Sequence, residues 1–392
     1  MIKLTNPEDC CGCSACEKVC PKQCITMKED FEGFLYPLID LDNCIDCGLC
    51  EKICPVINPQ TPQQPIKVYA ARNNDEQIRM RSSSGGIFTS LAEITISKGG
   101  VVFGACFDEN WEVKHDYVET IEDLKRLRGS KYAQSNMGDC YSQAKDFLKQ
   151  GREVLFSGTP CQIAGLKNFL KHDYDSLLTV DIICHGVPSR KVWRMYVNEL
   201  EKQNYIFFNR RLTPNQIRDI SFRNKRTGWK NYNFYFSIDF EDSLSEDFYE
   251  SHHNNTFMKA FLNNLCLRPS CHNCPAKSGK SKSDITIADY WSIQESLPEL
   301  DDDKGTNSVL VNTLKGEQYY SKTNATSIET ELEIAQRYNA GYLTNIPKHI
   351  NREHFFKLLD KKPNISHWID EMLPTEPKCK TLNIINKLFR KS

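Results

Sequence analysis

The chain has 392 residues, of which 40% are hydrophobic and 26% charged, and its formal net charge is −1. These values are typical of a globular protein of two or three domains, and they exclude a short disulfide scaffold and a basic nucleic-acid-binding domain. No stretch approaches the roughly 18 to 20 apolar residues of a membrane span. The first cysteine at position 10 leaves no room for a signal peptide, so a cytoplasmic location is expected.

Ten of the 18 cysteines lie in the first 54 residues, and eight of them form one pattern twice. Each copy reads Cys-x2-Cys-x2-Cys-x3-Cys-Pro, at residues 10–21 and 44–55. This is the ligand run of bacterial two-cluster ferredoxins, in which the fourth cysteine of each run binds the other run's cluster. Structural zinc and a disulfide framework are the alternatives. A zinc site needs four ligands, however, and does not need the additional Cys-x2 step that both runs contain. Residues 1–56 are therefore predicted to be a two-[4Fe–4S] ferredoxin domain that transfers electrons.

The interleaved pattern predicts which cysteines act together. Cluster one would use Cys10, Cys13, Cys16 and Cys54, and cluster two would use Cys44, Cys47, Cys50 and Cys20. Cys11 and Cys24 stand beside these ligands but outside the spacing. The isolated Cys106, Cys140 and Cys379 are expected to be buried small hydrophobic residues.

Charge is distributed unevenly along the chain. Residues 1–56 carry ten acidic and five basic side chains, a net −5, so the remainder is +4. Such an acidic module either docks a redox protein by electrostatic steering or is a solvated surface. Residues 378–392 carry five positive and no negative charges among apolar residues. They are predicted to form a basic amphipathic tail that packs on the body or touches a membrane surface or a partner.

Beyond a Pro/Gln-rich linker at 57–65, strand and helix patterns alternate, which predicts an α/β domain at 66–190 with a sheet of parallel character. The predicted strands are 67–72, 100–106, 153–158 and 177–184, and the predicted helices are 85–97, 137–149, 160–170 and 189–203. The C-terminal part, 191–377, has predicted strands at 220–223, 232–240, 284–290 and 308–313 and a helix at 256–266. In that part, 241–250 is predicted to be an acidic loop, and the chain beyond 314 to be mainly helical.

A second cysteine group, Cys266-x4-Cys271-x2-Cys274, lies far from the first. Three thiols need a fourth ligand, for which the candidates are Cys184, then Cys161, then His272. A Cys3His zinc site is the competing interpretation. The neighbouring ferredoxin domain favours a third [4Fe–4S] cluster, because a redox relay gains from a metal that changes oxidation state.

Two turns of small residues precede predicted helices, at 82–86 and 158–160. Free N–H groups at a helix start favour an anion such as phosphate, although serine, threonine and glycine are also ordinary helix caps. The chain has neither a GxGxxG fingerprint nor a Walker A run.

Six motifs, taken in order, resemble one family. They are Ser-Gly-Gly at 84–86, Gly-Ser-Lys-Tyr at 129–132, Gly-Thr-Pro-Cys-Gln at 158–162, Cys-His-Gly-Val-Pro-Ser at 184–189, the cysteines at 266–274, and Ser-Asp-Ile-Thr-Ile-Ala-Asp-Tyr-Trp at 283–291. Over essentially the full chain they resemble the beta subunit of hydrogenases and dehydrogenases that reduce the deazaflavin coenzyme F-420, fused to a two-cluster ferredoxin. Ala288 stands where the family often has glycine, a small-for-small change.

The resemblance implies an α+β / α/β fold, in which a small ferredoxin domain is followed by a larger α/β flavin-binding body with a mixed sheet. It implies FAD near a [4Fe–4S] cluster held by Cys184, Cys266, Cys271 and Cys274. The cofactor-binding residues that it implies are Ser84, Gly85, Gly86, Lys131, Tyr132, Gly158, Thr159, Pro160, Cys161 and Gln162.

The function expected from these features is transfer of electrons from a ferredoxin-type donor through clusters to FAD and on to an organic acceptor. Relatives reduce a deazaflavin or a chlorophyll derivative, and fused members resemble proteins found beside surface-polysaccharide genes, so the acceptor stays open between a deazaflavin-like coenzyme and a polysaccharide precursor. The clusters suggest an anaerobic setting. The alternative is an electron-transfer component that relays between protein partners without a substrate of its own. No catalytic acid or base is identified, and His185 is interpreted as a residue supporting the ligand beside it.

Overall fold

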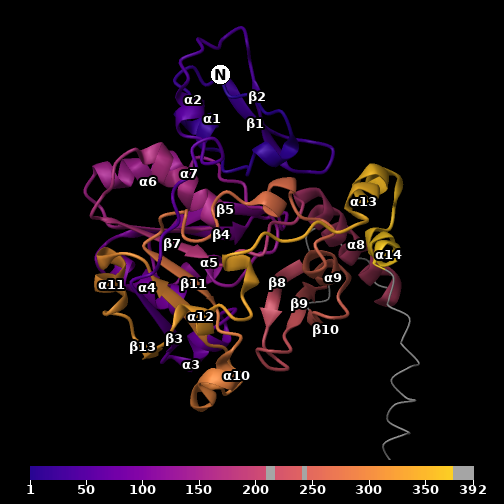
Figure 1. Cartoon of the computed structure of the whole chain (residues 1–392). Helices are drawn as coiled ribbons and strands as arrows, with labels where there is room; N and C mark the ends of the chain where they lie inside the picture. The colour runs from indigo at the N-terminus through magenta and orange to yellow at the C-terminus, as the bar shows by residue number, and fades with distance from the viewer. Residues whose placement is uncertain (209–216, 241–244, 374–392) are drawn as a thin grey trace, which may run out of the picture.

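The computed structural model describes residues 1–208, 217–240 and 245–373 of the chain (Figure 1). A small N-terminal module stands at one end of the molecule, and the body is built around one large sheet. Among the described residues, no helix is both long and apolar enough to cross a membrane. The basic tail at 378–392, with Cys379, lies outside the described residues.

The N-terminal module combines two short helices with one hairpin. Its elements are η1 (Pro7–Asp9), α1 (Ala15–Val19), β1 (Ile25–Glu29), β2 (Leu35–Ile39) and α2 (Leu49–Lys52). Strands β1 and β2 pair antiparallel, with Ile25 opposite Ile39. The small core of this module consists of Ile2, Ile25, Cys16, Cys24, Cys50 and Cys54. Thiols thus take the place of most apolar side chains that a domain of this size would need to bury.

The body contains an eight-stranded mixed sheet of order β13-β3-β12-β11-β7-β6-β4-β5. The strands are β3 (Lys67–Asn73), β4 (Val101–Phe107), β5 (Val113–Val118), β6 (Val154–Gly158), β7 (Leu177–Ile182), β11 (Ile285–Asp289), β12 (Asn307–Val311) and β13 (Ala325–Glu329). The central strands β11, β7, β6 and β4 run parallel, and the flanking pairs are antiparallel. The predicted α/β body with a mixed sheet is confirmed. Strands from both sides of residue 190 enter this one sheet.

Helices cover both faces of the sheet, which explains why its central strands are continuous apolar runs. In β4, Val101 and Phe103 pack with α6 (Cys140–Lys149) and α7 (Pro160–Leu170). Val102 packs on the opposite face with α4 (Ile87–Ser97), as the two-residue period of a strand requires. The parallel strands β6 and β7 have their carboxyl ends on the same side of the sheet, so the segments that follow them, 158–162 and 183–188, meet there.

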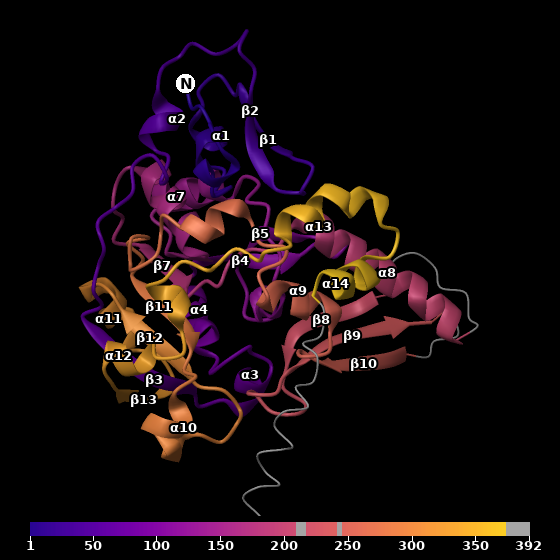
Figure 2. The same cartoon turned by 45° about the vertical axis from the view of Figure 1, so that its right-hand side comes forward.

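A second lobe lies beside the sheet (Figure 2). It holds an antiparallel sheet of order β10-β9-β8, formed by β8 (Ile217–Asn224), β9 (Asn233–Asp239) and β10 (Ser245–Ser251). Around its aromatic core lie α8 (Arg190–Phe208), α9 (Thr256–Leu262), α13 (Arg352–Leu358) and α14 (Ile365–Met372). The short elements are α3 (Glu76–Met80), α5 (Leu124–Leu127), η2 (Pro269–Asn273), α10 (Ile293–Ser296), η3 (Pro298–Leu300), α11 (Leu314–Tyr320), α12 (Leu332–Ala335), η4 (Ala340–Tyr342) and η5 (Leu359–Lys361).

Some local predictions are wrong. The acidic stretch 241–250 is predicted to be a loop, but its described part belongs to strand β10. Phe248 of that strand stacks on Phe236 of β9, with 4.7 Å between ring centroids, and such cross-strand contacts outweigh the acidic composition. Strand β13 lies in a region predicted to be mainly helical, and β1, β2 and β5 are not predicted. Strands β5 and β13 are the edges of the large sheet, where a half-exposed strand carries no continuous apolar run.

The module docks on the body through its own carboxylates and the arginines of the body. Glu29 of β1 lies 2.7 Å from Arg194 of α8. Glu32, in the turn of the hairpin, forms a buried ion pair of 2.5 Å with Arg352 of α13. Two carboxylates of the acidic module therefore pair with arginines of the same chain.

The segment 57–65 is attached to the surface of the body. Gln63 donates from Nε2 to Asn312 O at 2.7 Å, and its backbone N–H donates to Ser278 O at 3.1 Å. Gly279 comes so close that a Cβ atom there would lie 2.3 Å from Gln63 O. Contacts of the linker therefore add to the ion pairs that hold the module in place.

The Glu32–Arg352 pair gives a test of this docking. Removing one partner leaves the other charge buried without its counter-ion, so we expect Arg352→Met to lower the free energy of unfolding by about 3–5 kcal/mol. The double variant Glu32→Gln with Arg352→Met removes both charges and should lose clearly less. Urea denaturation of anaerobically purified chains, followed by tryptophan fluorescence, measures both losses. Equal losses in the single and double variants would contradict a buried charge pair.

Candidate functional site

Two small cavities in the N-terminal module are lined by the repeated cysteines. The inner cavity is lined by Cys10, Cys13, Cys16 and Cys54, with Cys11 beside them. The outer cavity is lined by Cys44, Cys47, Cys50 and Cys20, with Cys24 beside them. The fourth cysteine of each run therefore lies with the first three of the other run, as the interleaved assignment requires.

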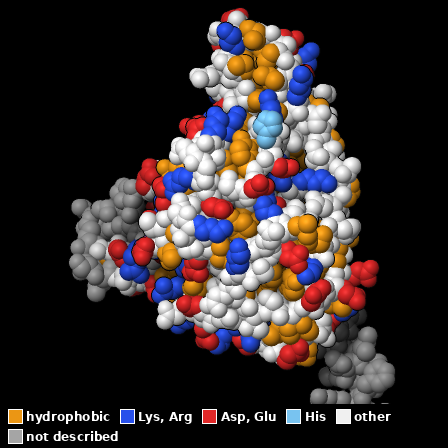
Figure 3. All heavy atoms as spheres, turned by 90° about the vertical axis from the view of Figure 1, so that its left-hand side faces the viewer, with side chains coloured by type: hydrophobic (Ala, Val, Ile, Leu, Met, Phe, Trp, Pro, Cys, Tyr) orange, Lys and Arg blue, Asp and Glu red, His pale blue; other side chains and the backbone are white. Residues whose placement is uncertain are grey.

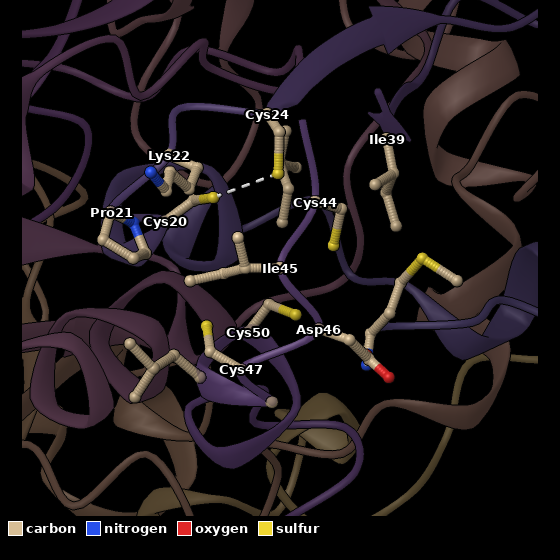
Figure 4. Close-up of a pocket in the computed structure, with 14 residues that line it drawn as sticks. Cys20, Pro21, Lys22, Cys24, Ile39, Cys44, Ile45, Asp46, Cys47 and Cys50 are labelled. Atoms are coloured by element: carbon tan, nitrogen blue, oxygen red, sulfur yellow. Dashed lines mark hydrogen bonds and ion pairs between the residues drawn. The ribbon is translucent and has the colours of Figure 1, made fainter. Parts of the chain in front are cut away.

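Figure 4 shows the cysteines that line the outer cavity. The sulfur atoms of Cys20 and Cys24 are 3.4 Å apart, and Cys44, Cys47 and Cys50 surround the same space. Cys47 is exposed to solvent, whereas the cysteines of the inner cavity are buried or half-buried. The outer cavity is thus the one that a partner molecule can approach.

Four further thiols converge in the body, at the start of α7, just after β7, and in and just after η2: Cys161, Cys184, Cys271 and Cys274. Burial raises the pKa of Cys184 well above its ordinary value, and the neighbouring thiols of Cys271, Cys161 and Cys274 raise it further. Val187 donates from its backbone N–H to the sulfur of Cys271 at 3.4 Å, so the loop after β7 wraps around the group. These four residues come from three separate parts of the chain.

Cys266, predicted to be a ligand, lies apart from this group. Its side chain is fully buried in the aromatic core of the second lobe, and the charge that acts on its thiol is that of Arg352 rather than of another cysteine. His272, the weakest candidate for the fourth ligand, donates from Nδ1 to Ile346 O at 2.9 Å. Within the described ranges, no three His, Cys, Asp or Glu side chains are arranged to hold a single metal ion.

A cavity of about 550 Å³ opens beside the four thiols, at the carboxyl ends of the parallel strands. Its volume lies within the roughly 300–1,000 Å³ of ligand pockets. Seven of the predicted cofactor-binding residues line it: Ser84, Gly86, Lys131, Tyr132, Gly158, Thr159 and Gln162. Gly85 instead packs against β3, where a Cβ atom would lie 2.5 Å from Ala71 O, and Pro160 and Cys161 lie behind the wall in α7. Cys184 also lines the cavity, so the cavity and the four thiols share a wall.

The serine-rich loop at 82–86 is held from behind by Lys225. The buried ammonium group of Lys225 donates to Ser84 O at 2.6 Å and to Arg79 O at 2.8 Å. Gly86 has a φ of +86°, a left-handed conformation that glycine adopts without strain, and α4 begins directly after it. Because Lys225 binds the Ser84 carbonyl oxygen and also that of Arg79 in α3, the loop has a fixed conformation with Ser84 and Gly86 on the cavity wall.

The turn after β6 is held by hydrogen bonds that pass through His115. Because Ser157 O can only accept, His115 donates to it from Nε2 at 3.0 Å, and its Nδ1 accepts from Ser135 Oγ at 2.8 Å. Gln162 donates from Nε2 to the same Ser135 hydroxyl at 2.8 Å and accepts at Oε1 from Thr159 N at 2.9 Å. This network requires a neutral imidazole, and burial lowers the pKa of His115 to about 4.

Sequence reasoning missed Arg223 on the cavity wall. Its guanidinium pairs with Asp289 at 2.9 Å and lies 4.1 Å from the centre of the Tyr232 ring. Among the described residues its Nε is buried and has no partner. No sequence signal could have found it, because only folding brings β8 of the second lobe to the end of β11. Arg128 and Arg223 make the lining net positive against its one carboxylate, that of Asp289, whereas burial lowers the pKa of Lys131 in the same wall to about 7.

His185 also lines this cavity. Burial lowers its pKa, and in its neutral form Nε2 donates to Asn264 Oδ1 at 2.7 Å. This bond anchors the loop that carries Cys184 to the end of α9.

The neutral state of His115 predicts a dependence of stability on pH. Its folded pKa of about 4 lies below the ordinary 6.5, so between these values the unfolded chain binds a proton that the folded chain does not. Stability is therefore unaffected above pH 6.5 and falls as the pH falls toward 4. Between pH 7 and 5 we expect wild type to lose about 2 kcal/mol more of its unfolding free energy than His115→Gln does. Parallel losses in urea denaturation at the two pH values would show that His115 is not responsible.

Two known protein families match this chain. Residues 9–58 match the family described as "4Fe-4S dicluster domain". Residues 68–140 match the N-terminal part, and residues 151–335 the C-terminal part, of the family described as the beta subunit of "Coenzyme F420 hydrogenase/dehydrogenase". The two parts of the latter family together span most of the body.

Two relatives illustrate the similarity. Over 176 residues the chain is 23% identical to a subunit of the F(420)H(2) dehydrogenase of Methanosarcina mazei; the match covers 41% of this chain and 49% of the relative, so the chain spans about half the length of that relative. It is also similar, at 18% identity and a TM-score of 0.43, to a chain of the F420-reducing [NiFe] hydrogenase complex from Methanosarcina barkeri, covering 79% of this chain and 92% of that one. The family matches show that this chain belongs to the family of coenzyme F420 hydrogenase/dehydrogenase beta subunits and carries a 4Fe–4S dicluster domain.

Proposed function

We propose that this chain is an iron–sulfur flavoprotein oxidoreductase that takes single electrons from a ferredoxin-type donor and reduces an organic acceptor. One observation carries the proposal: the outer cavity, the inner cavity, the four thiols of the body and the large cavity adjoin one another in that order. A series of adjacent redox sites that begins at the surface and ends at a ligand pocket is what such a reaction needs.

Contacts between cysteines join neighbouring sites in this series. Cys16 of the inner cavity and Cys50 of the outer cavity pack together in the small core of the module. Cys11, beside the inner cavity, packs in one hydrophobic cluster with Cys161 of the body. Cys184 belongs to the four thiols and also lines the large cavity. These contacts support electron transfer along the whole series.

The donor sets fit [4Fe–4S] clusters, because each of the three groups offers four thiols, and thiolates are the ligands of these clusters. In the module we assign the ligands as the interleaved spacing predicts. For the body we assign Cys161, Cys184, Cys271 and Cys274 in place of the set that included Cys266. When bound, such clusters supply one-electron storage.

The large cavity fits FAD. Its positive lining suits a pyrophosphate, and the loops at 82–86 and 158–162 stand at the starts of α4 and α7, where backbone N–H groups lack helical partners. Tyr132 offers an aromatic surface on the same wall. When bound, FAD supplies the conversion between single electrons and the two electrons that a closed-shell acceptor needs.

The open mouth of this cavity favours a reductase with its own substrate over a relay that only serves protein partners. The excess of cationic side chains on the wall favours an anionic organic acceptor. A deazaflavin-like coenzyme and an anionic polysaccharide precursor both meet that requirement. The family relationship favours the coenzyme as the first acceptor to assay.

The outer cavity is the site where a protein donor would dock. Ile45, which lines the outer cavity with Cys47, is 59% exposed, and Leu41 of the same module is 66% exposed. Hydrophobic side chains gather at this end of the molecule (Figure 3). An apolar tip around an exposed ligand allows a donor cluster to come close to the first acceptor.

Counts of iron, sulfide and flavin in anaerobically purified chains test the cofactor assignment. We expect about twelve irons and one FAD per chain. Cys161→Ala removes one ligand of the third cluster and should lower the count to about eight, whereas the matched Cys266→Ala variant should keep about twelve. The opposite pattern would restore Cys266 as the ligand. A wild-type chain with iron but no flavin would leave the relay as its function.

The support of the serine-rich loop by Lys225 predicts a flavin-binding defect. Lys225→Met removes the ammonium group that binds the carbonyl oxygens behind the loop, so we expect FAD to bind at least about tenfold more weakly, or 1.4 kcal/mol. The iron content should stay at the wild-type level. Lys230, which pairs with Asp301 at 2.5 Å outside the cavity, provides the control variant Lys230→Met. Equal FAD affinities of the two variants, measured by fluorescence titration, would place the flavin elsewhere.

A further inference from the structure

Arg268 joins the first ligand run to the cysteine loop of the body. It lies between Cys266 and Cys271 in the sequence, and none of its surface is exposed. Its Nε donates to Cys10 O at 2.8 Å and its Nη2 donates to Leu35 O at 2.9 Å, both in the N-terminal module. Its Nη1 donates to Gln134 Oε1 at 2.8 Å. All three acceptors are neutral.

This buried cation has no carboxylate partner within the part of the chain that the structure describes. The other fully buried arginines at the module and the large cavity are each paired: Arg352 with Glu32, and Arg223 with Asp289. Arg268 instead lies over the ring of Tyr36, with 4.3 Å from the guanidinium carbon to the ring centre. Because burying an unpaired charge is costly, the position calls for a negative group that the amino acids do not supply.

The surroundings of Arg268 show where that negative charge belongs. On one side it holds Cys10 of the inner cavity, and on the other its carbonyl oxygen accepts from Cys271 N at 3.0 Å. Gln134, its third partner, donates from Nε2 to Cys11 O at 3.0 Å. Cys11 in turn packs in one hydrophobic cluster with Cys161 of the body. The guanidinium group therefore bonds to the first ligand run, while the backbone of Arg268 belongs to the loop that carries Cys271.

We propose that Arg268 is a positioning residue whose charge is balanced by both clusters and which raises the reduction potential of each. The inference rests on the proposed function, since it requires the clusters. A cluster with four thiolate ligands is an anion that gains one more negative charge on reduction, so a fixed buried cation stabilises the reduced form. The same hydrogen bonds fix the separation of the two clusters, because they tie the first ligand run to the loop that carries Cys271.

Close packing around the guanidinium supports this positioning role. Gly12, which follows Cys11, has a φ of +69°, and a Cβ atom there would lie 2.7 Å from Nη1 of Arg268. The ligand run is therefore in direct contact with the arginine. Because Arg268 is fully buried, its charge acts through a medium of low dielectric constant, which strengthens the electrostatic effect.

The test is a redox titration of the holoprotein followed by electron paramagnetic resonance, with iron and sulfide counted in every sample. The wild type should show three reduction steps. In Arg268→Met two of them should move to lower potential, and the step of cluster two should stay, because none of its cysteines is bonded to Arg268. Arg268→Lys, which keeps the charge, should show smaller shifts. Gln134→Glu places a carboxylate beside the intact arginine and should lower the same two potentials.

The matched control is the double variant Glu32→Gln with Arg352→Met, which removes a buried arginine at the same docking surface together with its compensating charge. It should leave all three potentials unchanged. If Arg268→Met does not fold, Gln134→Glu decides: unchanged potentials in that variant overturn the inference. Full clusters with unshifted potentials in Arg268→Met overturn the inference alone, whereas a wild-type chain without clusters overturns the proposed function as well.

Discussion

The fold of the N-terminal module depends on a shortage of apolar side chains. Its core is mostly thiol, so the module gains stability from what the thiols bind and from the body on which it docks. The body provides arginines for the module's carboxylates, and Arg268 reaches directly to the backbone of the first ligand run. Docking on the body and binding of cofactors by the thiols thus both stabilise the module. Together they align the cysteine groups with the large cavity.

The parts of the fold that could be predicted are those in which local sequence already carries the signal. The central parallel strands are buried on both faces and appear as apolar runs, and Gly158-Thr159-Pro160 marks the start of α7. Strands β5, β10 and β13 escaped prediction because they are half-exposed and their pairing depends on a partner strand. An acidic composition also concealed β10, whose aromatic residues are matched only by those of β9.

In the candidate site, too, the residues that could be predicted are those with a local sequence signal. Each ferredoxin run follows a known ligand pattern, so the spacing predicts which cysteines share a cluster, including the fourth ligand that comes from the other run. The thiols of the body come from three separate segments, and nothing in the sequence says that Cys161 approaches Cys271 while the nearer Cys266 turns into the aromatic core. Arg223 and Arg268 were missed for a related reason, because a lone arginine acquires its role only from the groups that folding brings around it.

The attached linker has a consequence for how the molecule works over time. With Gln63 bonded to the body and Gly279 packed against it, the module is not a swinging carrier that visits its donor and then returns. Under the proposed function, each turnover would bring the donor to this fixed site, and the rate of their encounters would set the upper limit on turnover. Crowding, viscosity and ionic strength would then affect the uptake of electrons from the donor. The transfer of electrons between sites inside the protein would not depend on the solvent.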